Sequence, residues 1–340
     1  MADRLDEYRR KRDARRTPEP VPRGRPAPVP RENRFVIQQH HARSLHWDVR
    51  LERDGVLVSF AVPRGLPRDR HRNNLAKHTE DHPLEYLEFH GEIPAGEYGG
   101  GRMTIHDQGT YEADKWRDDE IGVTFHGDRT RGRYVFFRTA GNDWMVRRMD
   151  PAEPGWEPMP ETVHPMLATR AAGLPPDDAD WGYEMRWGGR RTLVLVSGGR
   201  VRVQDAEGAD VTSWYPELRP LGEALAPIEA VLDGEIVAFD GTVPSPALLE
   251  RRKPPRDSAA ARRAAERTPV QFLAFDLLWL EGHSTVELVR YAERRELLEG
   301  LSVAGDRWQT PPYFPGGGEF ALEAARAQGL TGVVAKRLDS

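Results

Sequence analysis

The sequence of 340 residues predicts an α+β protein with two domains, and three observations support this prediction. Residues 35–150 hold many short strand-like segments separated by turn residues, which is typical of a small antiparallel barrel or sandwich. Residues 151–162 contain four prolines and have the composition of a linker. Residues 163–340 mix longer apolar strands with helical segments, as α+β domains do.

The composition is that of a polar globular protein. Hydrophobic residues make up 38% of the chain, charged residues 30%, and the formal net charge is -5. The sequence has no apolar run of about 18 residues that could span a membrane, and its charged start differs from a secretory signal. It also has no cysteine, which excludes disulfides and thiolate metal ligands and fits a cytoplasmic protein.

Residues 1–34 form a basic, proline-rich arm. It carries eleven lysines and arginines against six acids. Residues 3–16 predict a short charged helix, and the six prolines between Pro18 and Pro30 predict an extended segment after it. A basic arm suits a phosphate-rich partner, although a solvated arm that keeps the chain soluble explains the charge equally well.

Each half has its own series of predicted elements. In the first, residues 50–62 predict a hairpin with Asp54-Gly55 at its turn, and residues 91–101 predict glycine-rich loops. Five further strands are predicted at 103–105, 109–112, 122–126, 133–138 and 143–148. In the second half, buried strands are predicted at 183–186, 191–196, 230–239, 271–279 and 332–336, and helices at 245–267, 286–301 and 318–328.

The stretch 40–50 is the first candidate for an active site. His46, Asp48 and Arg50 alternate with the apolar Leu45, Trp47 and Val49, so a strand here would place the two sets on opposite faces. Together with His40, the imidazoles and the carboxylate could chelate one divalent ion such as manganese or zinc, and the guanidinium suits a phosphate. The ordinary alternative is a surface stretch that happens to be rich in histidine.

A second polar stretch, residues 78–86, contains Glu80, His82 and Tyr86. Its density of histidine, acid and tyrosine is high for a purely structural segment. By itself it could be a polar turn that ends at Pro83. Paired with the stretch 40–50, it predicts the phosphate side of one shared pocket.

These motifs together resemble the 3′-phosphoesterase domain of the bacterial ligase D proteins of non-homologous end joining. The resemblance covers residues 3–150 and rests on the stretches 7–13, 17–20, 35–40, 45–52, 54–57, 61–65, 80–86 and 91–99. It implies a compact β-barrel that uses Mn²⁺ or another divalent ion. It also implies an enzyme that trims a 3′-ribonucleotide or a 3′-phosphate from DNA and leaves a 3′-OH.

The resemblance further implies a role for each matching residue. His40, His46 and Asp48 would hold the metal, and Arg50, His82 and Tyr86 would contact the scissile phosphate. Gln38 and Glu80 would support the site, and the arm would contribute Arg12, Asp13 and Glu19 at the 3′ nucleotide. Two positions depart from the family pattern, because Asn74 replaces an arginine and Arg64 replaces a lysine.

Residues 163–340 resemble the adenylation (nucleotidyltransferase) domain of ATP-dependent DNA ligases, through the stretches 163–168, 232–239, 272–278 and 332–337. The nucleophilic lysine of that family corresponds to Arg186 here, and a guanidinium stays protonated and cannot attack ATP. Gly188, Ala206 and Thr331 replace three further motif residues, and the sequence stops at Ser340, before the fifth motif and the oligonucleotide-binding domain. We therefore expect a degenerate domain with a vestigial nucleotide site of Arg186, Glu235, Phe275 and Lys336, and doubtful binding of ATP.

The sequence thus predicts a DNA 3′-end-processing phosphoesterase of bacterial double-strand break repair, joined to an inactive ligase-like domain. The alternatives are an ATP-dependent DNA ligase and a non-catalytic scaffold that binds DNA ends. The expected partners are DNA 3′ ends, with the Ku protein, a separate ligase or a polymerase as protein candidates and no membrane. The expected location is the cytoplasm, at the nucleoid.

Overall fold

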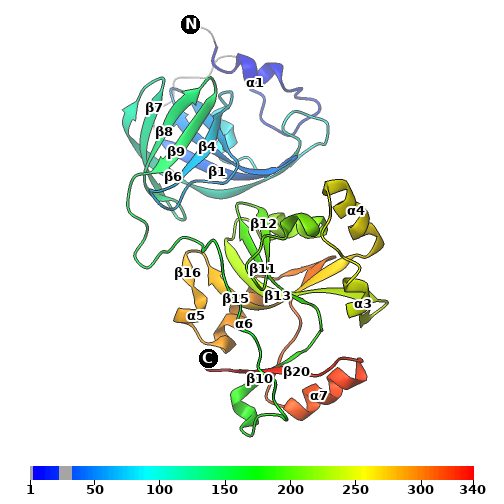
Figure 1. Cartoon of the computed structure of the whole chain (residues 1–340). Helices are drawn as coiled ribbons and strands as arrows, with labels where there is room; N and C mark the ends of the chain where they lie inside the picture. The colour runs from blue at the N-terminus through cyan, green and yellow to red at the C-terminus, as the bar shows by residue number, and fades with distance from the viewer. Residues whose placement is uncertain (1–2, 23–32) are drawn as a thin grey trace. The chain divides into compact units, whose positions relative to one another are not determined.

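The computed structural model describes residues 3–22 and 33–340 (Figure 1). The chain divides into two compact units, Met1–Pro154 and Gly155–Ser340. The division falls within the proline-rich segment 151–162. Part of the predicted extended arm, residues 23–32, lies outside the described residues. Among the described residues, no helix is long and apolar enough to cross a membrane.

The first unit is an antiparallel β-barrel. Its sheet has the strand order β1-β2-β3-β4-β9-β8-β7-β6-β5, and an additional pairing between β1 and β6 closes eight of the nine strands into a barrel. The prediction of a small antiparallel β domain is confirmed, in its barrel form. The elements are α1 (Asp6–Arg10), β1 (Arg34–His41), β2 (Leu45–Arg53), β3 (Val56–Val62), β4 (Asn73–His78), η1 (Leu84–Leu87), β5 (Gly91–Ile93), β6 (Gly101–Trp116), β7 (Glu120–Gly127), β8 (Arg131–Ala140) and β9 (Asp143–Arg148).

Aromatic side chains fill the barrel interior. Phe35 on β1 packs against Phe125 on β7, and Phe60 on β3 packs against Phe136 on β8, with ring centroids 4.7 and 4.8 Å apart. These strands are not neighbours in the sheet, so their rings meet across the barrel. Residues of the opposite parity on β1, β2 and β3 must therefore face outwards.

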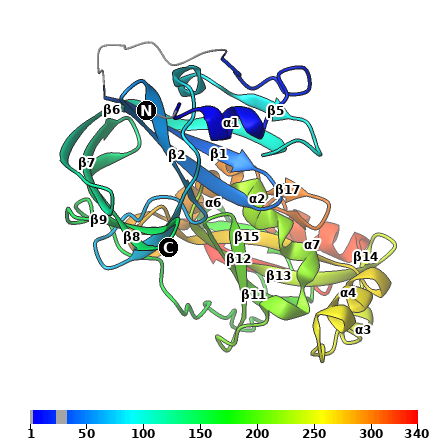
Figure 2. The same ribbon diagram turned by 90° about the horizontal axis from the view of Figure 1, so that it is seen from above.

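The outer face of β1, β2 and β3 is covered by the N-terminal residues and by η1. Tyr8 of α1 is fully buried in a cluster with Val36 of β1, Tyr86 of η1 and Ile93 of β5, and Figure 2 shows α1 beside β1 and β5. The tyrosine hydroxyl donates to the carbonyl of Pro20 at 2.7 Å. Within the predicted arm, residues 3–22 are therefore folded onto the barrel.

Four predicted segments of this unit differ from the structure. The helix predicted over 3–16 spans only Asp6–Arg10, the two strands predicted at 103–105 and 109–112 form the single strand β6, and the loops predicted over 91–101 begin with the strand β5. β4 could not be predicted from periodicity, because its sequence NNLAKH has no alternating apolar face and only Ala76 in it is buried. The hairpin turn is as predicted, with φ of 54° at Asp54 and 81° at Gly55.

The second unit combines two sheets with short helices, in agreement with the predicted α+β class. One sheet has the order β12-β11-β13-β15-β18-β17, with β14 and β16 as side pairings, and the other has the order β19-β10-β20. The strands are β10 (Trp181–Met185), β11 (Arg190–Ser197), β12 (Arg200–Asp205), β13 (Ala230–Asp240), β14 (Val243–Pro244), β15 (Val270–Leu280), β16 (His283–Ser284), β17 (Ala304–Gly305), β18 (Trp308–Gln309), β19 (Phe314–Pro315) and β20 (Val333–Arg337). The helices are η2 (Asp178–Asp180), η3 (Thr212–Trp214), η4 (Pro216–Leu218), α2 (Pro220–Leu225), α3 (Pro246–Leu249), α4 (Ser258–Arg267), α5 (Thr285–Leu288), α6 (Tyr291–Gly300) and α7 (Gly318–Ala327).

Two helices predicted in this unit are each broken into two. The segment 245–267 becomes α3 and α4, because the prolines at 254 and 255 cannot continue a helix. The segment 286–301 becomes α5 and α6, because the backbone is extended at Val289 and Arg290. Residues of β11, β13, β15 and the flanking helices form one large apolar core.

Candidate active site

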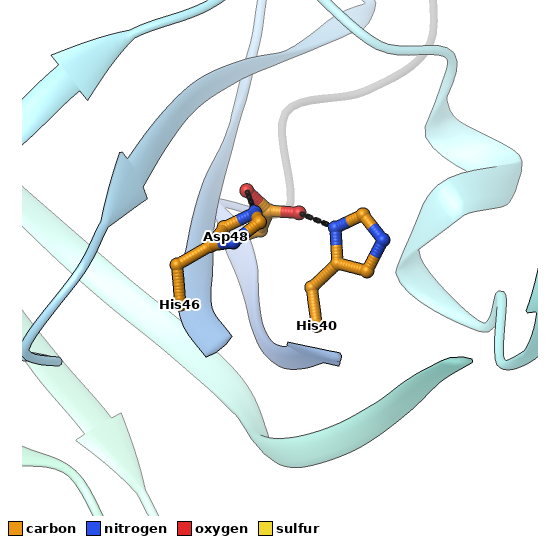
Figure 3. Close-up of side chains that lie close together, drawn as sticks. All are labelled: His40, His46 and Asp48. Atoms are coloured by element: carbon orange, nitrogen blue, oxygen red, sulfur yellow. Dashed lines mark ion pairs between the residues drawn. The ribbon is translucent and has the colours of Figure 1, made fainter. Parts of the chain in front are cut away.

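Three side chains converge on the outer face of the barrel where β1 pairs with β2. His40 lies opposite His46, and Gln38 lies opposite Asp48. One ligand atom from each of His40, His46 and Asp48 lies within 4.8 Å of the others, and Figure 3 shows the two imidazoles pointing toward the carboxylate. The distances to Asp48 are 3.6 Å from His40 Nδ1 and 3.7 Å from His46 Nε2.

Backbone carbonyls fix which imidazole nitrogens carry hydrogen. His40 Nε2 lies 2.8 Å from the carbonyl oxygen of Gly99, and His46 Nδ1 lies 3.0 Å from that of Ser44. A carbonyl can only accept, so these nitrogens donate and a neutral ring presents its other nitrogen as a lone pair. The two lone pairs, His40 Nδ1 and His46 Nε2, both face Asp48.

This donor set fits a divalent cation. Two imidazole lone pairs and a carboxylate oppose one another with no hydrogen between them, so a cation among them would relieve their repulsion. Burial alone would raise the pKa of Asp48, but the Arg50 guanidinium beside it holds that pKa well below its usual range. Asp48 is therefore ionised at neutral pH, as a metal ligand must be.

Arg50 brings a buried positive charge beside these ligands. Its Nη2 donates to Asp48 Oδ2 at 2.9 Å, and its Nε donates to Gln38 Oε1 at 2.7 Å. Gln38 is itself held by hydrogen bonds to the carbonyls of Tyr86 and Phe89, at 3.1 and 2.8 Å. Arg50 Nη1 is buried and has no hydrogen-bond partner within residues 3–22 and 33–340. This nitrogen can donate to an anionic oxygen.

A second group of charged side chains joins the N-terminal segment to η1. Arg12 donates from Nε to Glu19 Oε1 at 2.7 Å, and from Nη1 to Glu80 Oε1 at 2.9 Å. Tyr86 donates its hydroxyl hydrogen to Glu19. Each acid therefore shares the Arg12 guanidinium, and the arm is tied directly to the pocket.

His82 lies between these two groups. Its Nδ1 donates to the carbonyl of Glu80 at 2.8 Å, and its Nε2 lies 3.3 Å from Arg12 Nη2. Burial, together with Arg50 and Arg12, holds the pKa of His82 well below its ordinary value. Burial also raises the pKa of Tyr86. At neutral pH, His82 is therefore an uncharged acceptor at Nε2 and Tyr86 keeps its proton.

A cavity of about 850 Å³ unites most of the predicted residues. Its lining includes Arg12, Glu19, His40, His46, Asp48, Arg50, Glu80, His82 and Tyr86. Gln38 does not line it and acts through Arg50. Asp13 does not line it either: it is exposed, and its carboxylate accepts the N–H of Arg15 at 3.0 Å. The geometry gives the predicted role of Asp13 no support.

The structure adds residues that the sequence did not single out. Tyr98 lines the cavity, and Lys11 donates both to Glu80 at 3.0 Å and to Tyr98 at 3.3 Å. Tyr8 packs edge-on against both His82 and Tyr86. The spacing of Tyr8, Lys11 and Arg12 along α1 and its end could have indicated one helical face.

The two departures from the family pattern do not reach the cavity. Asn74 on β4 donates its side-chain amide to the carbonyl of Gly65 at 2.8 Å and so closes a loop. Arg64 is exposed. Neither residue is among those that line the cavity.

The residues of the predicted nucleotide site lie around β10, β13, β15 and β20 in the second unit. Phe275 on β15 has Lys336 Nζ 4.5 Å and Arg191 Cζ 4.7 Å from its ring centroid. Glu235 on β13 accepts the N–H of Gly189 at 2.9 Å. Arg186 follows β10 with an exposed side chain. The structure therefore brings Phe275 and Lys336 together but leaves Arg186 facing solvent.

Acids of this second site are paired with cations of the same unit. Asp233 accepts two hydrogen bonds from Arg191 at 2.7 Å, and Asp276 accepts from Arg294 at 2.9 Å. Glu184 lies 2.9 Å from Lys336 Nζ. These carboxylates have positive partners, as Asp48 has in Arg50, but these pairs do not include the imidazole nitrogens that face Asp48.

Comparison with known families agrees with this division of the chain. Residues 38–138 match the family model for the DNA Ligase D 3′-phosphoesterase domain, and residues 165–340 match the model for the ATP dependent DNA ligase domain. The second match spans just over half of the chain, so the chain belongs to the family of the ATP dependent DNA ligase domain. The first match covers a smaller part of the chain and is a similarity to the 3′-phosphoesterase domain of DNA Ligase D.

Named relatives are similar over the whole chain. It is 44% identical to the multifunctional non-homologous end joining protein LigD of Mycolicibacterium smegmatis over 352 residues, and 46% identical to that of Mycobacterium bovis over 345 residues. Both alignments cover 100% of this chain and 44% of the relative, so the chain spans less than half of their length. A crystal structure of the ligase domain from M. tuberculosis LigD is 41% identical over 52% of this chain and 54% of that chain, with a TM-score of 0.45.

Proposed function

We propose that the first unit hydrolyses phosphate esters at the 3′ ends of DNA during bacterial double-strand break repair. It would remove a 3′-phosphate, a 3′-ribonucleotide or both, and leave a 3′-OH. The observation that carries this proposal is the convergence of His40, His46 and Asp48 in one cavity, beside the Nη1 of buried Arg50, which has no hydrogen-bond partner in the described part of the chain. Such a site offers a place for a divalent cation and a place for a phosphate next to each other.

His40, His46 and Asp48 would hold a divalent ion such as Mn²⁺. Bound there, the ion would polarise phosphate oxygens and lower the pKa of water. Arg50 would bind a non-bridging phosphate oxygen through Nη1 and stabilise the charge that develops there. Gln38 orients this guanidinium by accepting from its Nε.

His82 and the arm would handle protons and position the 3′ nucleotide. Since His82 Nε2 is an unprotonated acceptor, it can accept a proton from an attacking water or a hydrogen bond from a hydroxyl of the substrate. Tyr86 keeps its proton and can donate to a phosphate oxygen if it releases Glu19. Arg12 stays charged beside Glu19 and Glu80 and adds positive charge at the same end of the cavity.

A labelled duplex with a 3′-phosphate or a single 3′-ribonucleotide tests this function directly. We expect the full chain to release the terminal group with Mn²⁺ and not with EDTA, and the variant His40→Ala to release none. Asp143→Asn on β9 is a matched control, because Asp143 is exposed and does not line the cavity. Metal-independent release, or release unchanged by His40→Ala, would contradict the proposal.

We further propose that the second unit keeps the ligase fold without self-adenylation. The position of the nucleophilic lysine is Arg186, which stays protonated and lies exposed after β10. Radiolabelled ATP should therefore leave no covalently bound AMP on the chain. A covalent adduct would instead favour an ATP-dependent ligase, and DNA binding without turnover under any metal would favour a scaffold.

The proposed partners follow from this chemistry. DNA 3′ ends would be the substrate, and the end-binding protein Ku, a separate ligase or a polymerase would act on the same breaks. Processing of DNA breaks would place the protein in the cytoplasm, at the nucleoid. Co-purification of these proteins with the full chain, before and after nuclease treatment, tests whether the association is direct.

A further inference from the structure

The cavity has one large exposed aromatic side chain on its lining. Tyr98 is 48% exposed, whereas Arg50 and His82 in the same lining are 2% and 4% exposed. The pocket therefore combines a buried part that contains the Arg50 guanidinium with an aromatic ring that solvent can reach. A buried guanidinium suits a phosphate, and an exposed aromatic ring suits the flat face of a nucleobase.

The ring is held in place by the N-terminal segment. Lys11 Nζ lies 4.8 Å from the ring centroid and donates to the tyrosine hydroxyl at 3.3 Å, and Arg12 Cζ lies 5.3 Å from the centroid. Arg16 pairs with the neighbouring Glu97 at 2.6 Å. A ring fixed in this way loses little conformational freedom when a ligand binds.

The loop that carries Tyr98 also touches the candidate metal site. Gly99, the next residue, accepts a hydrogen bond from His40 Nε2 at 2.8 Å. Its φ of +75° is a conformation that side chains disfavour, so the loop has a defined shape at this point. Tyr98 is therefore adjacent in sequence to Gly99, the residue whose carbonyl orients the candidate metal ligand His40.

We propose that Tyr98 is the stacking platform for the terminal base of a 3′ end, while the terminal phosphate lies against Arg50 and His82. The proposal rests on the proposed phosphoesterase function and adds how the nucleotide is recognised. Stacking uses the π face that every base has, so the site would accept all four bases. It would discriminate against phosphate esters that lack a base.

Equilibrium binding of two matched probes tests this role without turnover. Both are DNA duplexes with a one-nucleotide 3′ overhang that ends in a 3′-phosphate; the overhanging nucleotide is normal in one and a tetrahydrofuran abasic analogue in the other. In EDTA, we expect the full chain to bind the base-bearing probe about 10-fold more tightly, within the range of one base–aromatic stack. Tyr98→Ala should abolish this preference, whereas Tyr98→Phe and Tyr98→Trp should keep it.

The main competing role for Tyr98 is to anchor the N-terminal segment alone. In that case Tyr98→Ala would weaken the binding of both probes equally, and this result would overturn the proposal. An unchanged preference of Tyr98→Ala for the base-bearing probe would overturn it as well. Leu75→Ala on β4 is the control, because Leu75 is also exposed, at 43%, and does not line the cavity. It should leave the preference intact.

Phosphate release from the same probes separates this proposal from the function on which it rests. A wild-type chain that prefers the base-bearing probe but releases no phosphate with Mn²⁺ contradicts the phosphoesterase function and not the platform. A chain that releases phosphate equally well from both probes, and binds them equally, contradicts the platform alone.

Discussion

The buried carboxylates of the two units differ in what surrounds them besides an arginine. Around Asp48 in the barrel, two histidines present lone pairs toward the acid, and Arg50 donates to it from Nη2 while its Nη1 has no hydrogen-bond partner among the described residues. In the ligase-like unit, Asp233 and Asp276 are neutralised by arginines of the same unit. Asp48 also has an arginine partner, but the imidazole lone pairs beside it can bind a cation from outside, whereas Asp233 and Asp276 are paired with arginines and with no histidine among the described residues.

This contrast teaches where to look for chemistry in a chain of this kind. Both sites contain buried acids, and both lie on strands with apolar flanks, so burial and charge alone do not separate them. The direction of the neighbouring hydrogen bonds does. Backbone carbonyls at Gly99 and Ser44 take the hydrogens of the two histidines and leave ligand atoms exposed to the cavity.

The largest effect is expected when one ligand is removed from the candidate metal site of His40, His46 and Asp48. Asp48→Asn should lower metal-dependent phosphate release on the order of 1,000-fold, because a neutral amide binds a divalent ion weakly and no longer balances Arg50. Calorimetric titration with Mn²⁺ should show the site lost. Retention of both metal binding and activity would mean that Asp48 is only the structural partner of Arg50.

The next test breaks the buried ion pair between Arg294 and Asp276 in the second unit. Arg294→Met leaves Asp276 buried without its bidentate partner and should destabilise this unit by about 3–5 kcal/mol. Thermal unfolding of the full chain should show one transition lowered by about ten degrees, with phosphate release retained at low temperature. Arg337→Met removes an exposed pair with Asp339 and is the control. Equal stability of the two variants would show that the buried pair is not needed.

A smaller effect is expected where the barrel site depends on orientation alone. Gln38→Leu removes the acceptor for Arg50 Nε, so the guanidinium is free to turn from the cavity, and kcat should fall by about 10- to 100-fold. Gln39→Leu is a matched control, since Gln39 has the opposite parity and its buried amide nitrogen has no hydrogen-bond partner among residues 3–22 and 33–340. If both variants lose activity equally, the loss comes from the strand and not from Arg50.

The smallest expected effect is the dependence of the protein's stability on pH. The folded-state pKa of His82 lies well below its ordinary value of 6.5, so the unfolded chain binds a proton there that the folded chain excludes. The stabilisation of the folded state by uncharged His82 is fully present above about pH 6.5. It is lost progressively as the pH falls below that value. Unfolding midpoints at pH 7.5 and 5.5 should therefore differ less in His82→Gln than in the wild type. The same difference in both chains would assign the acid sensitivity to other groups.

Strand periodicity was enough to predict one half of the candidate site. The alternation of His46, Asp48 and Arg50 with apolar residues placed the polar set on one face, and the register of β1 with β2 brings them together as expected. The carbonyls that orient the histidines could not be predicted, because every residue has one and only the fold selects Gly99 and Ser44. Asp13 illustrates the reverse case: a motif match placed it in the site, but its side chain is used in a local turn.

Long-range packing explains the remaining misses. β4 has too few apolar residues to show an alternating pattern, and it is a strand because β3 and β9 pair with it. Leu5 and Tyr8 are buried apolar side chains in a charged segment, and the residues that pack around Tyr8 lie far along the chain. Sequence periodicity does not contain this information.

The barrel and the candidate site share the strands β1 and β2 but use opposite faces of them. Substitutions among the outward residues can therefore accumulate without disturbing Phe35, Phe60 and the other rings that hold the barrel together. Activity and foldability can be inherited separately in such a domain. A descendant could lose its catalysis one ligand at a time and persist as a stable binding module.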